Sequence, residues 1–121
     1  MHELSIAMAL VEQMEKVARE QKARAVPSVT VVVGALSGVD AEALAGAFPL
    51  AAEGTVAQGA ELVITPACAS VRCRACGQVT TPELPFLRCG GCGASEVEVV
   101  SGRELYIQAM DVEVAGEAGG E

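Results

Sequence analysis

The sequence predicts an α+β fold in which two helices pack on a small mixed or antiparallel sheet, with a four-cysteine segment inserted into the chain. Two stretches carry apolar residues at helical spacing, and four short stretches rich in valine and isoleucine lie between turn residues. All five cysteines lie within residues 68–93, which hold few large apolar side chains. Such a segment cannot build a hydrophobic core of its own.

The first helix is predicted over residues 4–17, where the larger apolar residues recur every three or four positions. The face that they form comprises Leu4, Ile6, Met8, Leu10, Val11, Met14 and Val17. We expect its methionines to fill core space. After Pro27, the run from Ser28 to Val33 is rich in valine and ends at Gly34, so it predicts the first strand.

The second helix is predicted over residues 41–53, with Asp40 as its N-cap and Gly54 as its terminator. Its apolar side holds Leu44, Ala47, Phe48 and Ala51. Pro49 lies inside this pattern. Because proline removes a backbone hydrogen bond and clashes one turn back, we expect a kink or break near Ala45.

Three further strands are predicted. Residues 61–65 form a strand that ends at Pro66, and residues 96–100 and 105–114 form two strands around a turn at 101–104. That turn brings the chain back from the cysteine-rich segment to the first domain. The small and acidic residues 115–121 predict a disordered tail.

Composition excludes several classes of function. The chain of 121 residues has a formal net charge of -8 and only 2% aromatic residues, so it lacks the cationic surface and stacking rings that nucleic acid requires. No stretch is long and apolar enough for a membrane-spanning helix, and Glu3 stands where a secretory signal carries lysine or arginine. We therefore expect a cytoplasmic protein with reduced thiols, without nucleic-acid or membrane partners.

Four of the cysteines form two closely spaced pairs. Cys73 and Cys76 are separated by two residues, as are Cys89 and Cys92, and a glycine follows each pair. Two such turns can place four thiolates around one cation, and a closed tetrahedral sulfur site favours structural zinc. The competing interpretations are a redox disulfide, a mononuclear iron site and an iron–sulfur cluster.

Other residues near the pairs have simpler explanations. Arg72, Arg74 and Arg88 flank the cysteines and would partly neutralise the negative charge of a zinc site with four thiolates. Cys68 lies outside the paired spacing, so we expect a free or buried thiol there.

The single histidine is the second residue of the chain. The Met1 amine, the His2 amide nitrogen and the His2 imidazole can bind one metal through fused rings, and Glu3 can complete the set. A planar arrangement of nitrogen donors suits nickel(II) or copper(II). A lone histidine near a terminus is, however, usually a solvated side chain, and the pattern alone leaves both interpretations open.

The chain resembles the HypA/HybF family of hydrogenase nickel-incorporation proteins. The resemblance rests on MHELSIA, VGALSGVDAEALAGAF, AAEGT, GAELVI, the doubled Cys-x-x-Cys and VVSGRELYI, in that order. It implies a nickel-binding α/β domain over residues 1–67 and 97–114 and a zinc domain inserted at 68–96. It also implies nickel at His2, with Met1 and Glu3 beside it, and structural zinc at Cys73, Cys76, Cys89 and Cys92.

The resemblance also implies a function and partners. Family members hand nickel to the precursor of the [NiFe]-hydrogenase large subunit together with a partner GTPase, and some serve urease. We therefore expect a nickel metallochaperone that is not an enzyme and that is monomeric or homodimeric. Two other classes stay open on the residues alone: a zinc-ribbon interaction module without a nickel role, and a thiol redox protein that uses one Cys-x-x-Cys pair.

Overall fold

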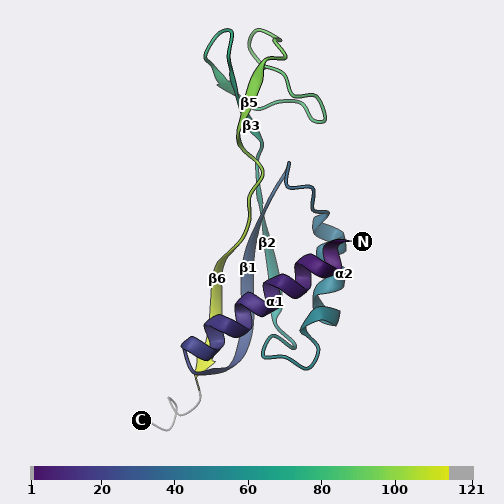
Figure 1. Cartoon of the computed structure of the whole chain (residues 1–121), viewed down its shortest axis with the longest axis vertical. Helices are drawn as coiled ribbons and strands as arrows, with labels where there is room; N and C mark the ends of the chain where they lie inside the picture. The colour runs from purple at the N-terminus through teal and green to yellow at the C-terminus, as the bar shows by residue number, and fades with distance from the viewer. Residues whose placement is uncertain (1, 115–121) are drawn as a thin grey trace. The chain divides into compact units, whose positions relative to one another are not determined.

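The computed structural model describes residues 2–114. Two helices and six strands follow one another along the chain. In order they are α1 His2–Glu20, β1 Ala23–Gly34, α2 Ala41–Ala52, β2 Glu61–Ala67, β3 Ser70–Cys73, β4 Val79–Thr80, β5 Val97–Ser101 and β6 Leu105–Val114 (Figure 1). None of these described helices is long and apolar enough to span a membrane. The architecture is α+β, as the sequence predicts.

The strands form two sheets of three strands each, in the orders β2-β1-β6 and β4-β3-β5. The described chain divides into two compact units: residues 2–31, 39–65 and 106–114 form the first, and residues 32–38 and 66–105 form the second. Both helices belong to the first unit, and all five cysteines belong to the second.

The second unit contains β5 as well as the cysteine-rich segment. β5 pairs antiparallel with β3, with Val99 opposite Val71 and Val97 opposite Cys73. The stretch after the cysteines therefore completes the second sheet before β6 joins the first. The expected tail at 115–121 lies outside the described residues.

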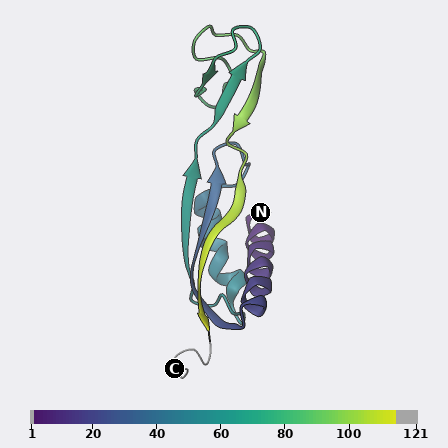
Figure 2. The same ribbon diagram turned by 90° about the vertical axis from the view of Figure 1, so that its left-hand side faces the viewer.

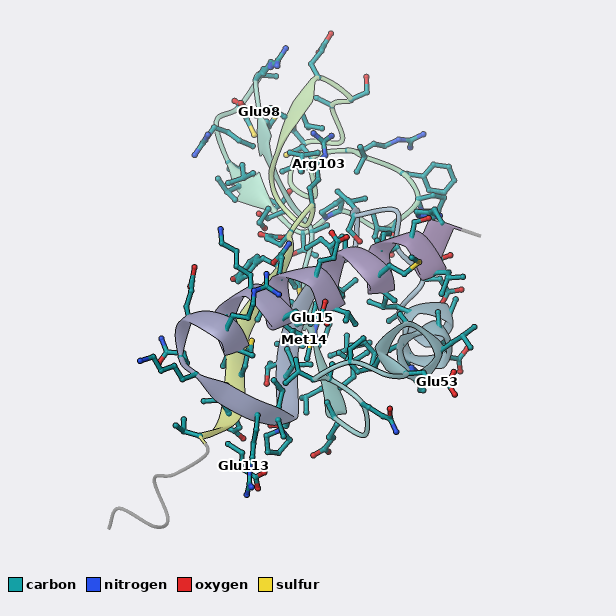
Figure 3. The ribbon with its side chains drawn as sticks, turned by 60° about the horizontal axis from the view of Figure 1, so that its bottom comes forward. Met14, Glu15, Glu53, Glu98, Arg103 and Glu113 are labelled. Carbon is teal, nitrogen blue, oxygen red and sulfur yellow. The ribbon has the colours of Figure 1, made fainter. Side chains whose placement is uncertain are left out.

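The core of the first unit lies where α1 packs against α2 (Figure 2). Met14 on α1 is fully buried (Figure 3). Leu44 and Phe48 on α2 are also buried, with at most 2% of their surface exposed. The buried face of α1 differs from the predicted one: it uses Ala7 and Ala18, whereas Met8 is 54% exposed. Small alanines allow close packing, so the helix turns its larger Leu4, Met8 and Val17 side chains outward.

The helix α2 begins at the predicted N-cap. The Asp40 carboxylate accepts the backbone N–H groups of Glu42 and Ala43 at 3.0 and 3.2 Å. The helix then continues without interruption through Pro49, so the expected break near Ala45 does not occur. Ala45 is exposed, so water can bind the carbonyl that Pro49 leaves unpaired, and the burial of Phe48 and Ala52 on either side of Pro49 holds the last turn in place.

Two segments of the second unit, residues 34–36 and 102–104, cross at very close range. Gly34 donates its N–H to the Glu104 carbonyl at 2.7 Å, and Leu36 donates to the Gly102 carbonyl at 2.6 Å. A Cβ atom on Gly34 would lie 2.1 Å from the Gly102 carbonyl oxygen, and Gly102 itself has a φ of 118°. Both positions therefore require glycine.

Candidate metal centres

The two cysteine pairs form two turns of the same design. In the first turn, Cys73 Sγ accepts the N–H groups of Ala75 and Cys76, both at 3.3 Å. In the second turn, Cys89 Sγ accepts the N–H groups of Gly91 and Cys92 at 3.3 and 3.4 Å. The glycine after each pair has a φ of 79°, which lets the chain curl so that these N–H groups point at sulfur. The two-residue spacing and the glycine that follows it together account for the local geometry.

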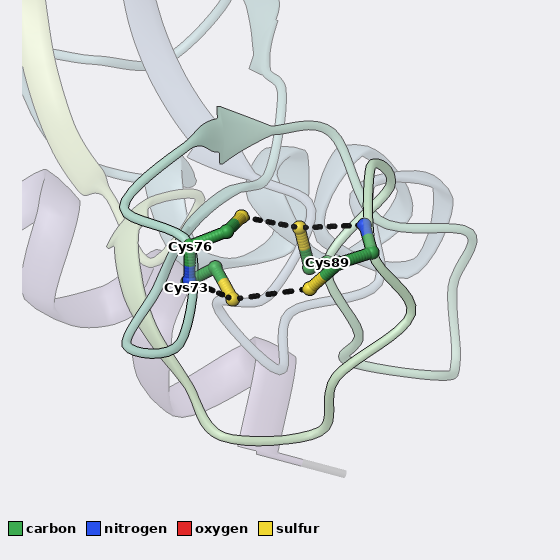
Figure 4. A group of neighbouring side chains, drawn as sticks. Cys73, Cys76 and Cys89 are labelled. Carbon is green, nitrogen blue, oxygen red and sulfur yellow. Dashed lines mark hydrogen bonds between the residues drawn. The ribbon is translucent and has the colours of Figure 1, made fainter.

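The turns face each other and bring four sulfur atoms together (Figure 4). Cys73 Sγ lies 3.5 Å from Cys92 Sγ, Cys76 Sγ lies 3.6 Å from Cys89 Sγ, and all four atoms lie within 4.8 Å of one another. A Zn–S bond of about 2.3 Å in a regular tetrahedron separates sulfurs by about 3.8 Å. The donor set and its dimensions therefore fit a tetrahedral zinc ion bound by four thiolates.

Without a metal, the four thiols hold their protons unequally. The Cys92 N–H, and then the Gly91 N–H, lower the pKa of Cys89 to about 6. The Cys76 N–H lowers the pKa of Cys73 from its ordinary value. For Cys76, the backbone of Gln78 acts to lower the pKa, but the partial desolvation of the sulfur and its hydrogen bonds with the neighbouring sulfurs outweigh it and raise the pKa to about 12. Metal binding must therefore displace protons from the site.

The residues that flank the site have other contacts. Arg72 Nη1 lies 3.9 Å from Glu98 Oε1, and the Arg88 guanidinium lies over the Phe86 ring, 5.4 Å from its centroid. Neither contact involves sulfur. Cys68 is an exposed free thiol outside the cluster.

The predicted nickel residues lie at the start of α1. The His2 side chain is 60% exposed, and its Nδ1 lies 3.7 Å from Glu3 Oε1. The first N–H groups of a helix do not take part in its repeating backbone hydrogen bonds, so a metal that bound the backbone nitrogens of residues 2 and 3 would leave that repeating pattern intact. Met1 lies outside the described residues.

Glu3 has a second contact that the sequence does not reveal. Its side chain is only 9% exposed, and Oε2 accepts the backbone N–H of Asp40 at 3.0 Å. This hydrogen bond is the largest of several causes that lower the pKa of Glu3 to about 2. Asp40 therefore lies beside the predicted nickel residues. Because Glu3 and Asp40 are 37 positions apart, no local pattern could have paired them.

The fold and the cysteine cluster define a class of protein: an α+β metal-binding protein with a helical unit and a separate tetrathiolate unit. The chain belongs to the HypA family, described as "Hydrogenase/urease nickel incorporation, metallochaperone, hypA", which it matches over residues 1–112. The resemblance seen in the sequence is thereby confirmed.

Curated relatives and solved structures agree with this membership. The chain is 42% identical to the hydrogenase maturation factor HypA of Chlorobaculum tepidum over 93% of its own length and 100% of the relative's. It is 44% identical to the HypA of a Synechococcus species over 93% and 99% of the two chains. A solution structure of the Ni metallochaperone HypA from Helicobacter pylori aligns with a TM-score of 0.68, at 26% identity, over 94% of this chain and 99% of that one.

Proposed function

We propose that this protein is a nickel metallochaperone that delivers Ni(II) for the maturation of [NiFe]-hydrogenase. The observation that carries the proposal is the match to the nickel-incorporation family over residues 1–112, which includes both His2 and the four clustered cysteines. The family description also names urease, so urease maturation is a second destination for the same cargo.

Nickel binds, in this proposal, to the Met1 amine, the His2 amide and imidazole nitrogens, and Glu3. An exposed imidazole at the first turn of α1 is accessible to both nickel and a receiving protein. Loss of protons from backbone amides leaves negative charge at the helix N-terminus, where the helix dipole favours it. Planar nitrogen ligation suits Ni(II) better than Zn(II), so the N-terminal site selects nickel and the cysteine site selects zinc.

Cys73, Cys76, Cys89 and Cys92 hold structural zinc. Four protein sulfurs close the tetrahedron and leave no position for water or substrate, so zinc here shapes the second unit and performs no catalysis. The chain is accordingly a carrier and not an enzyme: its one histidine is assigned to nickel, and no described cluster pairs a nucleophile with a base.

The partners follow from the cargo. The receiving protein is the precursor of the hydrogenase large subunit, assisted by a nickel-handling GTPase, and the transfer takes place in the cytoplasm between proteins, with this chain a monomer or homodimer. A zinc-ribbon interaction module without a nickel role is the alternative, and it leaves His2 and its Glu3 contact without a purpose.

Nickel titration by calorimetry and absorption on four forms of the chain tests this function. The native chain should bind nickel tightly, and so should Cys76→Ser wherever it stays soluble. His2→Ala should lose tight binding, and an extra residue before Met1 should weaken it almost as much, because the extension converts a basic amine into a poorly donating amide. If the His2→Ala and extended forms keep native affinity while Cys76→Ser loses it, nickel belongs to the cysteines and the proposal is wrong.

A further inference from the structure

The two cysteine turns have equivalent backbone hydrogen bonds, but they differ in the length of one side chain. Cys73 donates its N–H to the Gln78 carbonyl at 2.8 Å, and Cys89 donates its N–H to the Ala94 carbonyl at 2.9 Å. Gly77 and Gly93 donate to the Cys73 and Cys89 carbonyls, both at 2.9 Å. Gln78 and Ala94 therefore occupy equivalent positions, but only Gln78 has a side chain long enough to reach beyond its own turn.

The Gln78 side chain extends from the first turn to the second. Its Oε1 lies 3.8 Å from Cys76 Sγ. A Cβ atom built on Gly91 would lie 2.0 Å from the same Oε1 and 3.1 Å from Cδ. The amide end of Gln78 thus occupies the space beside Cys76 that a side chain at position 91 would otherwise take.

The third residue of each turn matches this difference. The second turn has Gly91 at the position where the first turn has Ala75, and it has Ala94 at the position where the first turn has Gln78. A long side chain at 78 is thus combined with glycine at 91, and a short side chain at 94 with alanine at 75. Both N–H groups, Gly91 and Ala75, still donate to the first sulfur of their own turn at 3.3 Å.

We propose that Gln78 is a positioning residue for the metal site, whose side-chain amide donates a hydrogen bond to the Cys76 thiolate when zinc is bound, and that Gly91 is the glycine that admits it. The inference rests on the proposal that the four cysteines bind zinc. A thiol can donate to Oε1, but a zinc-bound thiolate only accepts, so the amide presents its NH2 group to sulfur. Such outer contacts orient ligands and strengthen metal binding.

The geometry also provides a way to remove the contact without disturbing the turn. The atom that would clash with a Cβ at position 91 is the far end of a flexible side chain, so Gly91→Ala displaces the Gln78 amide and leaves the backbone in place. The next nearest atom, Cys89 Sγ, lies at an ordinary 3.7 Å. Gly91→Ala and Gln78→Ala should therefore remove the same interaction by two routes.

The test measures zinc affinity by competition with a chromophoric chelator on the full chain, for Gln78→Ala, Gly91→Ala and the double variant. Each single substitution should weaken zinc binding about 10-fold, at the low end of such effects because Gln78 and Cys76 are exposed. The double variant should be no weaker than either single variant, because both remove one interaction. Gln58→Ala and Gly46→Ala, which change the same residue types in the other unit, should retain native affinity.

Two further variants separate hydrogen bonding from space filling. Gln78→Met keeps the bulk without the donor and should behave as Gln78→Ala, whereas Gln78→Glu brings a carboxylate to the thiolates and should weaken zinc further. In the cobalt(II)-substituted chain, loss of the amide donor should shift the sulfur-to-metal charge-transfer bands, which a merely structural role would leave unchanged. Native affinity in Gln78→Ala, or losses that multiply in the double variant, would overturn the proposal. A native chain without zinc would instead overturn the parent assignment.

Discussion

The carboxylate of Glu3 accepts the backbone N–H of Asp40 at 3.0 Å, and this bond joins the first turn of α1 to the N-cap of α2. The same Glu3 side chain approaches His2 through its other oxygen, at 3.7 Å. Glu3, one of the residues proposed to bind nickel, therefore also anchors the second helix.

The Glu3 contact predicts a specific pH dependence of stability. The pKa of Glu3 is lowered to about 2 in the folded chain from an ordinary 4.5, so the folded state favours its charged form. This stabilisation is fully present above about pH 5 and is lost as the pH falls through the folded pKa. Urea unfolding at pH 5, 4 and 3, followed by helical circular dichroism, should show less pH dependence in Glu3→Gln than in the native chain. Glu42→Gln is the control and should follow the native curve.

The helix cap at Asp40 contributes separately from the Glu3 contact, because the cap uses the side chain and the Glu3 contact uses the backbone. Asp40→Ala should lower the free energy of unfolding by about 1 kcal/mol. Asp40→Ser, which keeps a capping oxygen, should recover most of that loss. Equal losses in both variants, measured by urea unfolding at pH 7, would contradict a capping role.

The cysteine cluster predicts one zinc per chain, measured by elemental analysis. Cys76→Ser should lose zinc and unfold the second unit, because metal binding in small tetrathiolate sites contributes on the order of 10 kcal/mol to folding. Cys68→Ser is the matched control and should keep its zinc, because Cys68 lies outside the cluster. Hydrogen exchange over residues 66–105 reports the folding of the unit. A second unit that stays protected after chelation would refute the structural role of zinc.

The crossing at Gly34 predicts opposite effects for two glycine substitutions. Gly34→Ala places a Cβ 2.1 Å from a backbone oxygen, so the segments must separate, and we expect a loss of about 1–3 kcal/mol of stability. Gly46→Ala lies in open space within α2 and should stabilise the chain by about 0.5–1 kcal/mol, because alanine favours helix. Thermal unfolding of both variants compares the two. Equal effects would show that the close approach at Gly34 is unimportant.

Local sequence determined the features that depend on residues close in the chain. The two Cys-x-x-Cys-Gly turns form because each sulfur accepts N–H groups only two or three positions away. Asp40 caps α2 for the same reason. The spacing of apolar residues predicted both helices, and the motifs from MHELSIA to VVSGRELYI were sufficient to identify the family.

Only the tertiary structure decided which distant residues meet. The burial of Ala7 and Ala18 in place of Met8 depends on how closely α1 approaches its neighbours, which helical spacing does not encode. The intact helix at Pro49 depends on the core around Phe48. Three contacts join residues that are far apart in the sequence, at separations from 13 to 37 positions. They are the Glu3–Asp40 hydrogen bond, the pairing of β5 with β3, and the approach of the Gln78 side chain to Gly91. Such contacts form only when the chain folds into its tertiary structure, because no short-range hydrogen bond or steric preference selects the partner residue.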